Sequence, residues 1–176
     1  PDGTQVANIT ATADGFTAGS AALDVTDDDA TILVVDDRDD AFSADAGFKR
    51  RNVPGAYGNN NHAMRGGTGE ASWTFTGLEE GQYFVSTTWN HIYGNRYNTE
   101  RAPFSIRNGS GNLLSTIMVD QTQSPDDFTE GGYGWKDLAP VYINDGTLVV
   151  TLGASSTNLH AVADAIRIEL NESLSP

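Results

Sequence analysis

The stretch Leu78-Glu79-Glu80-Gly81-Gln82-Tyr83-Phe84-Val85-Ser86-Thr87-Thr88-Trp89 decides the fold class of this chain. Every second residue from Tyr83 to Trp89 is apolar or a threonine, and a period of two residues brings such side chains to one face of a β-strand. The leucine, glycine and tyrosine that open the stretch are typical of a tyrosine corner, where a tyrosine hydroxyl bonds the upstream backbone. We therefore predict a β-sandwich strand here, with Trp89 in the core.

The same alternation recurs along most of the chain, in short segments that glycine and asparagine separate. The expected strands contain Ala7 to Ala13, Ala21 to Val25, Thr31 to Val35, Trp73 and Phe75, Phe104 and Ile106, Ile117 and Val119, Val141 and Ile143, Leu148 to Leu152, and Val162 to Leu170. Strands at such short spacing predict an all-β chain, an antiparallel β-sandwich of the jelly-roll kind. Asp145-Gly146 between apolar segments predicts a tight hairpin, and only Gly131–Leu138 suggests a helical turn.

An acidic run, Asp27-Asp28-Asp29, marks a predicted domain boundary. Residues 1–29 read as a hairpin of small side chains, which cannot form a core by itself. A heavier, aromatic-rich unit begins just after the run, and we expect it to span residues 31–170, with 171–176 as a linker. The chain opens Pro1-Asp2-Gly3 without an initiator methionine, so we expect it to be a piece of a longer polypeptide.

Composition narrows the function classes. The 176 residues carry 10 Lys and Arg against 24 Asp and Glu, a net charge of −14. Such a surface repels phosphate backbones and anionic lipids, so we expect neither nucleic-acid binding nor membrane insertion. Cysteine is absent, which excludes disulfides, thiolate metal sites and cysteine nucleophiles. The composition favours an acidic β-protein that is secreted or lies on the cell surface.

Residues 31–170 resemble the golvesin C-terminal-like domain, a module also found attached to xanthan lyases. The resemblance rests on motifs in the expected order: Val35-Asp36-Asp37, Phe42, Ala71-Ser72-Trp73-Thr74-Phe75, Gly81-Gln82-Tyr83, Thr88-Trp89, Asn95-Arg96, Ala102-Pro103-Phe104-Ser105-Ile106, Val119-Asp120-Gln121, Trp135, Gly146 to Leu152 and Val162 to Glu169. It implies a carbohydrate-binding-module-like β-sandwich that acts as a non-catalytic accessory, and it carries over no binding residues.

The N-terminal segment has a resemblance of its own. Thr10-Ala11-Thr12-Ala13-Asp14-Gly15-Phe16 and Val25-Thr26-Asp27-Asp28-Asp29 resemble the final two strands of a Calx-beta type repeat. Such repeats occur in tandem in large bacterial surface proteins and often bind calcium. The resemblance implies that residues 1–29 are the tail of a preceding repeat and pack on a neighbouring domain of the same chain or lie loosely.

Three aspartates are candidate metal ligands. Asp164 shares the parity of Val162 and Ile166, so its carboxylate is expected to face the core while Ala163, Ala165, Arg167 and Glu169 face away. Asp36 and Asp37 directly follow an apolar strand, and the oxygens of clustered carboxylates suit Ca²⁺. For Asp164 the alternative is an aspartate that pins a loop by hydrogen bonds; we place it ahead, because buried carboxylates more often satisfy backbone donors than bind metal. Asp36 and Asp37 are the better metal candidates. Asp27–Asp29 read as a solvated linker or a junctional calcium site.

Aromatic and amide residues gather in expected loops, a composition that suits sugar rings with their apolar faces and hydroxyl rims. The candidate sugar contacts are Tyr57, Asn60, His62, His91, Tyr93, Arg96 and Tyr97. In the alternative interpretation the asparagines only hold turns, and Trp89 and Trp135 belong to the core. The parity of Trp89 favours the core for that residue.

Enzyme signatures are scarce: neither G-x-S-x-G, H-E-x-x-H nor a P-loop occurs. Glu79, Glu80 and Glu100 leave a glycosidase-like carboxylate pair open. A sandwich without such motifs more often binds than reacts. We therefore expect a non-catalytic module that binds extracellular polysaccharide, with a structural calcium ion as a possible cofactor. The alternative function is a structural or adhesive spacer that binds no glycan.

Overall fold

The computed structural model describes residues 5–25, 31–90, 93–155 and 158–171. The chain divides into two compact units, Pro1–Thr31 and Ile32–Pro176, which are described separately. The predicted run Asp27–Asp29 and most of the predicted linker 171–176 lie outside the described residues. Among the described residues, no helix is long and apolar enough to cross a membrane.

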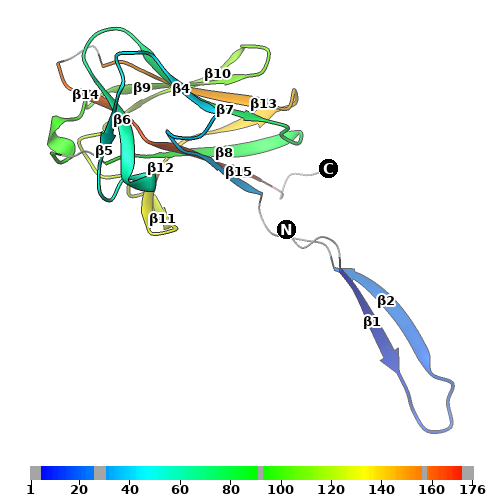
Figure 1. Cartoon of the computed structure of the whole chain (residues 1–176). Helices are drawn as coiled ribbons and strands as arrows, with labels where there is room; N and C mark the ends of the chain where they lie inside the picture. Colours follow the sequence, from blue (N-terminus) through cyan, green and yellow to red (C-terminus); the bar gives the residue numbers. More distant parts are fainter. Residues whose placement is uncertain (1–4, 26–30, 91–92, 156–157, 172–176) are drawn as a thin grey trace. The chain divides into compact units, whose positions relative to one another are not determined.

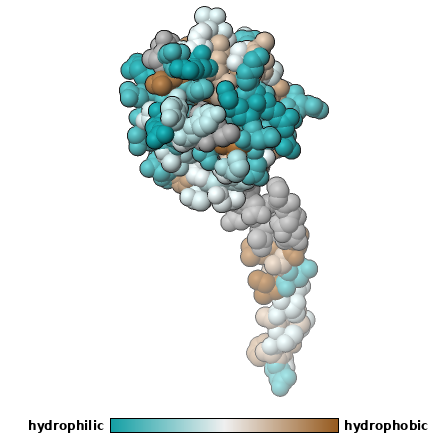
Figure 2. Space-filling model, turned by 60° about the vertical axis from the view of Figure 1, so that its left-hand side comes forward, coloured by the Kyte–Doolittle hydropathy of each residue, from teal (hydrophilic) through white to brown (hydrophobic). Residues whose placement is uncertain are grey.

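The first unit is a hairpin of β1 (Gln5–Ala11) and β2 (Gly19–Val25), drawn in blue in Figure 1. The strands pair antiparallel with Ile9 opposite Ala21, so the hairpin that the alternation predicted is confirmed. Ile9 and Leu23 are more than half exposed, and the space-filling view shows apolar patches on this hairpin (Figure 2). Two strands alone are marginally stable in water, and these bury little of their apolar surface.

The second unit is an antiparallel β-sandwich, as predicted (Figure 1). Sheet I has the order β10-β9-β13-β7-β4, sheet II the order β11-β12-β8-β15-β3, and sheet III the order β14-β6-β5. Their strands are β3 (Ile32–Val35), β4 (Phe42–Ala44), β5 (Lys49–Asn52), β6 (Asn60–Arg65), β7 (Glu70–Thr76), β8 (Gly81–Thr88), β9 (Ala102–Asn108), β10 (Leu113–Val119), β11 (Phe128–Glu130), β12 (Tyr133–Ile143), β13 (Thr147–Gly153), β14 (His160–Ala163) and β15 (Ala165–Leu170). Two short 3₁₀ turns, η1 (Tyr57–Asn59) and η2 (Asn95–Tyr97), lie in loops.

Alternation places the core between sheets I and II. On β13, Leu148, Val150 and Leu152 are fully buried while the residues between them are partly exposed. The Tyr83 hydroxyl donates to the Glu79 carbonyl at 3.0 Å, which confirms the tyrosine corner. Trp89 is buried, and its indole N–H donates to the backbone carbonyl of Gln121 at 3.0 Å. Its predicted place in the core is therefore confirmed.

The predicted hairpin around Asp145-Gly146 is wrong. β12 belongs to sheet II and β13 to sheet I, so the turn carries the chain from one sheet to the other. The Asp145 carboxylate accepts backbone N–H groups of Gly109 and Ser110 at 3.2 and 3.0 Å, and Gly146 adopts a φ of +72°. Asp145-Gly146 forms the tight turn that the sequence indicated. Its contacts with the β9–β10 turn hold it as a connection between the two sheets and not as a hairpin.

The predicted helical turn at 131–138 is also wrong. Gly131 and Gly132, with φ of +61° and +86°, form the turn of a hairpin in which Glu130 lies opposite Tyr133. The residues that follow belong to β12, where Trp135 is buried. Glycines at positive φ favour the hairpin turn over a right-handed helical turn.

The segment Val162 to Leu170 is two strands, not one. β14 ends at Ala163 and pairs with β6, whereas β15 begins at Ala165 and pairs with β8 and β3. Asp164 lies at the break and is 1% exposed, which confirms its inward orientation. Ala163 and Ala165 are buried as well, against the prediction, because the chain is covered on both faces where it passes from sheet III to sheet II. Arg167 faces away from the core, as predicted, but it is buried by Glu130 and Phe128 of β11.

Candidate functional site

Strand pairing brings Asp36, Asp37 and Asp164 together. β3 and β15 are antiparallel with Val35 opposite Ile166, and the same register continued beyond Val35 sets Asp37 opposite Asp164. One carboxylate oxygen from each aspartate lies within 4.8 Å of the other two. Like charges at this distance repel strongly in a buried setting. The cluster therefore needs a proton, hydrogen-bond donors or a cation.

The segment from η1 into β6 covers this carboxylate cluster. The Tyr57 backbone N–H donates to Asp164 Oδ2 at 3.3 Å, and His62 Nδ1 lies 2.6 Å from Asp37 Oδ2. Gly58 has a φ of +60°, and a Cβ at this position would lie 2.7 Å from Asp36 Oδ2. Only glycine allows the backbone to approach Asp36 so closely in this conformation. The loop is thus shaped around the carboxylates.

Burial perturbs the acidity of all three aspartates. It raises the pKa of Asp36 to about 7, with further increases from its hydrogen bond with Asp37 and from the charge of Asp37. Burial likewise raises the pKa of Asp37 to about 6, although Arg50 and Arg38 oppose the shift. The pKa of Asp164 lies well above its ordinary value because burial outweighs the Tyr57 N–H. Burial and the charge of Arg50 lower the pKa of His62. Without a cation, the cluster retains protons near neutral pH.

Unpartnered oxygens show that these residues fit a hard cation. Among the described residues, the buried oxygens Asp37 Oδ1, Asp164 Oδ1, Asn60 Oδ1 and Asn61 Oδ1 have no hydrogen-bond partner. The β14–β6 register, continued one residue past Ala163 opposite His62, sets Asn61 opposite Asp164. Buried polar atoms are rarely left unsatisfied. Carboxylate and amide oxygens are the ligands that Ca²⁺ prefers, in sets of six to eight with backbone carbonyls and water.

A separate cavity of about 350 Å³ opens beside the η2 loop, and we call it the tip pocket. It is lined by Arg65, Tyr93, Tyr97, Asn158, Leu159 and His160. Arg65 and His160 lie side by side because β6 and β14 pair at these residues. Tyr93 and Tyr97 are 64% and 42% exposed. The pocket thus presents two aromatic rings and a guanidinium group to solvent.

Hydrogen bonds of two asparagines anchor the η2 loop, which carries Tyr97. The Asn98 side-chain amide donates to the Gln121 carbonyl at 3.1 Å, and the Asn95 amide donates to the Gln123 carbonyl at 3.2 Å. These two asparagines hold the loop, as the alternative interpretation proposed. The rings of Tyr93 and Tyr97 meet edge to face at 6.1 Å. Such an anchored pair loses little conformational entropy when it binds a ligand.

The arginines of this region are held as well. The Arg96 guanidinium lies 4.8 Å from the centre of the Tyr97 ring and donates to its hydroxyl at 3.1 Å. Arg65 Nε donates to the Asn158 carbonyl at 3.0 Å. A guanidinium carries five donors, so both arginines keep N–H groups for a ligand.

The structure divides the seven predicted sugar contacts into two groups. Tyr93, Arg96 and Tyr97 lie together at the surface. Tyr57, Asn60 and His62 lie beside the carboxylate cluster. The ring centre of Tyr57 lies 4.8 Å from that of Tyr133 and 5.8 Å from that of Trp135. Asn60 is 1% exposed, and the His62 side chain is paired with the Asp37 carboxylate. His91 lies outside the described residues.

Sequence reasoning missed the other walls of the tip pocket. Arg65, Asn158, Leu159 and His160 line it. Arg65 and His160 are adjacent only through the pairing of β6 with β14. Because the two residues are far apart in the sequence, no local pattern indicates that they are neighbours. A prediction that β6 pairs with β14 would have identified them.

The family model of the golvesin C-terminal domain matches residues 33–170 of this chain. The chain belongs to this family. The golvesin-like part of the predicted resemblance is confirmed, whereas the match does not reach residues 1–29, and their Calx-beta resemblance stays a prediction. No curated protein matches the chain.

Solved structures share the fold of this golvesin-family chain at low sequence identity. A xanthan lyase from Paenibacillus is 20% identical with a TM-score of 0.66, and the match covers 85% of this chain but 14% of the lyase. A family 35 carbohydrate-binding module from Cellvibrio japonicus is 14% identical with a TM-score of 0.54, covering 78% of this chain and 92% of the module. The C-terminal family 6 module of a laminarinase from Zobellia galactanivorans is 15% identical with a TM-score of 0.53, covering 78% and 98%. These likenesses establish a carbohydrate-binding-module fold.

Proposed function

We propose that the golvesin-family sandwich is a non-catalytic polysaccharide-binding module of a larger secreted or cell-surface protein, and that it binds glycan in the tip pocket. The observation that carries this proposal is the exposed pair Tyr93 and Tyr97, which lines a cavity of about 350 Å³ together with Arg65, while Arg96 lies against the Tyr97 ring. Pockets of this size hold small ligands of one or two rings. The fold shared with carbohydrate-binding modules supports the same function.

The chemistry of the tip pocket suits a sugar. Tyrosine rings offer flat apolar surfaces for the C–H face of a pyranose. Arg65, Arg96 and Asn158 surround the rings with groups that can bond ring hydroxyls. Guanidinium groups also form paired hydrogen bonds with a carboxylate, so a uronic acid is the sugar type that the pocket would bind best.

The carboxylate cluster has a structural role in this proposal. Asp36, Asp37 and Asp164 would hold Ca²⁺ together with the amide oxygen of Asn60 or Asn61. The ion supplies the positive charge that the buried carboxylates lack. The protein contributes Gly58, which lets the loop approach, and the Tyr57 N–H, which orients Asp164. The hydrogen-bonded alternative is disfavoured by the unpartnered oxygens.

Affinity electrophoresis tests the proposal directly. The whole chain is run through gels that contain xanthan or laminarin, because a xanthan lyase and a laminarinase contain domains of the same fold. We expect retention on at least one gel, and Tyr97→Ala reduces it. Tyr142→Ala is the matched control, because Tyr142 is also exposed but lies outside the tip pocket. Equal retention of wild type and Tyr97→Ala would remove the tip pocket from the proposal.

A spacer is the second candidate function, and the hairpin of the first unit favours it. Ile9 and Leu23 expose apolar surface there, which suits packing against a neighbouring domain. If the folded protein is retained by none of the polysaccharides, the spacer function is favoured over glycan binding.

A further inference from the structure

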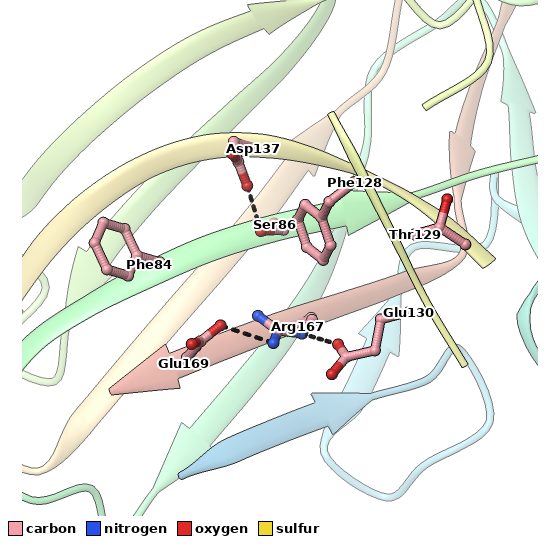
Figure 3. A pocket seen from close by; sticks show the side chains of 8 residues that line it. All are labelled: Phe84, Ser86, Phe128, Thr129, Glu130, Asp137, Arg167 and Glu169. Atoms are coloured by element: carbon pink, nitrogen blue, oxygen red, sulfur yellow. Dashed lines mark hydrogen bonds and ion pairs between the residues drawn. The ribbon is translucent and has the colours of Figure 1, made fainter. Parts of the chain in front are cut away.

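A second cavity, of about 340 Å³, lies on the outer face of sheet II, and we call it the sheet groove. It is lined by Phe84, Ser86, Phe128, Thr129, Glu130, Asp137, Arg167 and Glu169 (Figure 3). None of these residues lines the tip pocket, and none belongs to the carboxylate cluster. The proposed function makes no use of this cavity.

Strand register explains why these side chains meet. Ser86 on β8 lies opposite both Asp137 on β12 and Arg167 on β15, and Phe84 lies opposite Glu169. The hairpin of β11 and β12 brings Phe128 and Glu130 to the same side (Figure 3). Side chains from four strands thus converge on one surface.

The floor of the groove is a buried cation. Arg167 is 4% exposed although it faces outward from the sheet. Its guanidinium pairs with Glu130 and with Glu169, the latter at 2.7 Å, and lies 5.2 Å from the centre of the Phe128 ring. Burying a guanidinium is costly unless its N–H groups are bonded, and here both carboxylates bond it. Arg167 therefore holds two carboxylates in fixed positions at the groove.

These carboxylates face solvent as hydrogen-bond acceptors. The side chains of Glu130 and Glu169 are 42% and 33% exposed, and each pairs with Arg167 through its Oε2 atom. Asp137 adds a third carboxylate, which accepts the Ser86 hydroxyl at 2.9 Å. Three carboxylates against one guanidinium leave a negative excess. The groove therefore suits a ligand rich in hydroxyl donors and repels anionic ligands.

Aromatic rings give the groove its apolar surface. Phe84 is 43% exposed beside the polar floor, and Phe128 stands across from it (Figure 3). A phenylalanine left exposed on a sheet face contributes nothing to the core, whereas its flat ring can cover the C–H face of a sugar. Fixed acceptors beside an open ring are the pair of features that a pyranose requires.

We propose that the sheet groove is a second carbohydrate site, specific for uncharged sugar units and independent of the tip pocket. Its negative excess sets its preference apart from that of the tip pocket, where Arg65 lines the cavity and Arg96 lies against the Tyr97 ring. Two sites on one module let a single polysaccharide chain, or two chains, be held at once. Binding through both sites raises the overall affinity without new contacts.

A titration of the ¹⁵N-labelled whole chain tests this proposal. The probes are cellohexaose, laminarihexaose and xylohexaose, all uncharged, and amide shifts are followed by NMR. With at least one probe we expect the amides of Phe84, Ser86 and Glu169 to shift in a saturable manner. Unchanged groove amides with all three probes would overturn the proposal, whatever happens at Tyr93 and Tyr97.

Variants separate the groove from the rest of the surface. Phe84→Ala should weaken binding at the groove about tenfold, as expected for loss of one stacking ring, and Phe84→Tyr should retain it. Leu113→Ala is the matched control, because Leu113 is 53% exposed on sheet I. If Phe84→Ala binds at the groove as tightly as wild type, while its spectrum shows an intact fold, the proposal is wrong.

Discussion

The carboxylate cluster yields the sharpest prediction: calcium should stabilise the chain most at alkaline pH. The pKa values of Asp36 and Asp37 stand at about 7 and about 6 in the metal-free fold, against an ordinary value of 3.8 for an aspartate. Between pH 4 and 7 the folded state therefore binds more protons than the unfolded state. The free energy of unfolding must fall as the pH rises through this window.

The magnitude follows from the size of the shifts. One pKa unit corresponds to about 1.4 kcal/mol, so the rise of about three units at Asp36 limits the contribution of that residue to about 4 kcal/mol. Solvent screening at this partly exposed side chain reduces the effect, and we expect a loss of about 2 kcal/mol between pH 4 and pH 8 in chelator. Calcium at a hundred times its dissociation constant adds about 2.7 kcal/mol. For a domain of this size that raises Tm by roughly 5–11 °C.

Thermal unfolding followed by circular dichroism measures both effects. Wild type is melted at pH 5 and pH 8, in EGTA and in millimolar calcium, with magnesium as the comparison because it dehydrates reluctantly. Asp164→Asn should raise Tm in EGTA at pH 8, since a carboxyl group no longer has to be buried or protonated when the chain folds, and should abolish the calcium increment. Asp126→Asn, at an exposed aspartate, is the matched control and should keep the increment.

Two results would refute this reasoning. Equal melting temperatures in calcium and EGTA at pH 8 would show that the cluster binds no calcium. A calcium increment that survives Asp164→Asn unchanged would place the ion elsewhere. In either case the aspartates would serve as acceptors that pin the loop at Tyr57.

Three further predictions concern other parts of the sandwich. Gly58→Ala should lower the free energy of unfolding in urea by about 1–3 kcal/mol and weaken the calcium increment, because the new Cβ strains the backbone and meets a carboxylate. Gly111→Ala is the control: Gly111 has a φ of +80° with open space around it, so the substitution should lower the free energy of unfolding less and leave the calcium increment intact. Tyr83→Phe removes the hydrogen bond to the Glu79 carbonyl and should cost about 1 kcal/mol, with an unchanged fold by circular dichroism. Arg96→Gln should weaken retention on xanthan more than on carboxyl-reduced xanthan, and equal weakening would contradict a role in pairing with uronate.

Local sequence patterns predicted most of the long strands and the tyrosine corner correctly. Alternation identifies β8 and β13 because side chains in a strand alternate between faces whatever the partner strand is. The tyrosine corner at Tyr83 follows from another local signal, the leucine, glycine and tyrosine that open β8. The burial of Asp164 was predicted from alternation, although both neighbouring alanines are buried too. The tight turn at Asp145-Gly146 was also predictable, since a turn depends on the backbone conformation of only a few residues.

Strand pairing could not be predicted from the sequence, and the candidate sites depend on it. Val35 lies opposite Ile166, and that register alone makes neighbours of Asp37 and Asp164. The sheet groove likewise depends on β8, β11, β12 and β15 lying in one sheet. Alternation with a period of two residues is common to all strands, so it does not predict which strands pair. Pairing is selected by the packing of the whole core, between residues far apart in the sequence. Local pattern therefore fixes which way a side chain points, and the assembled sheets fix what it meets.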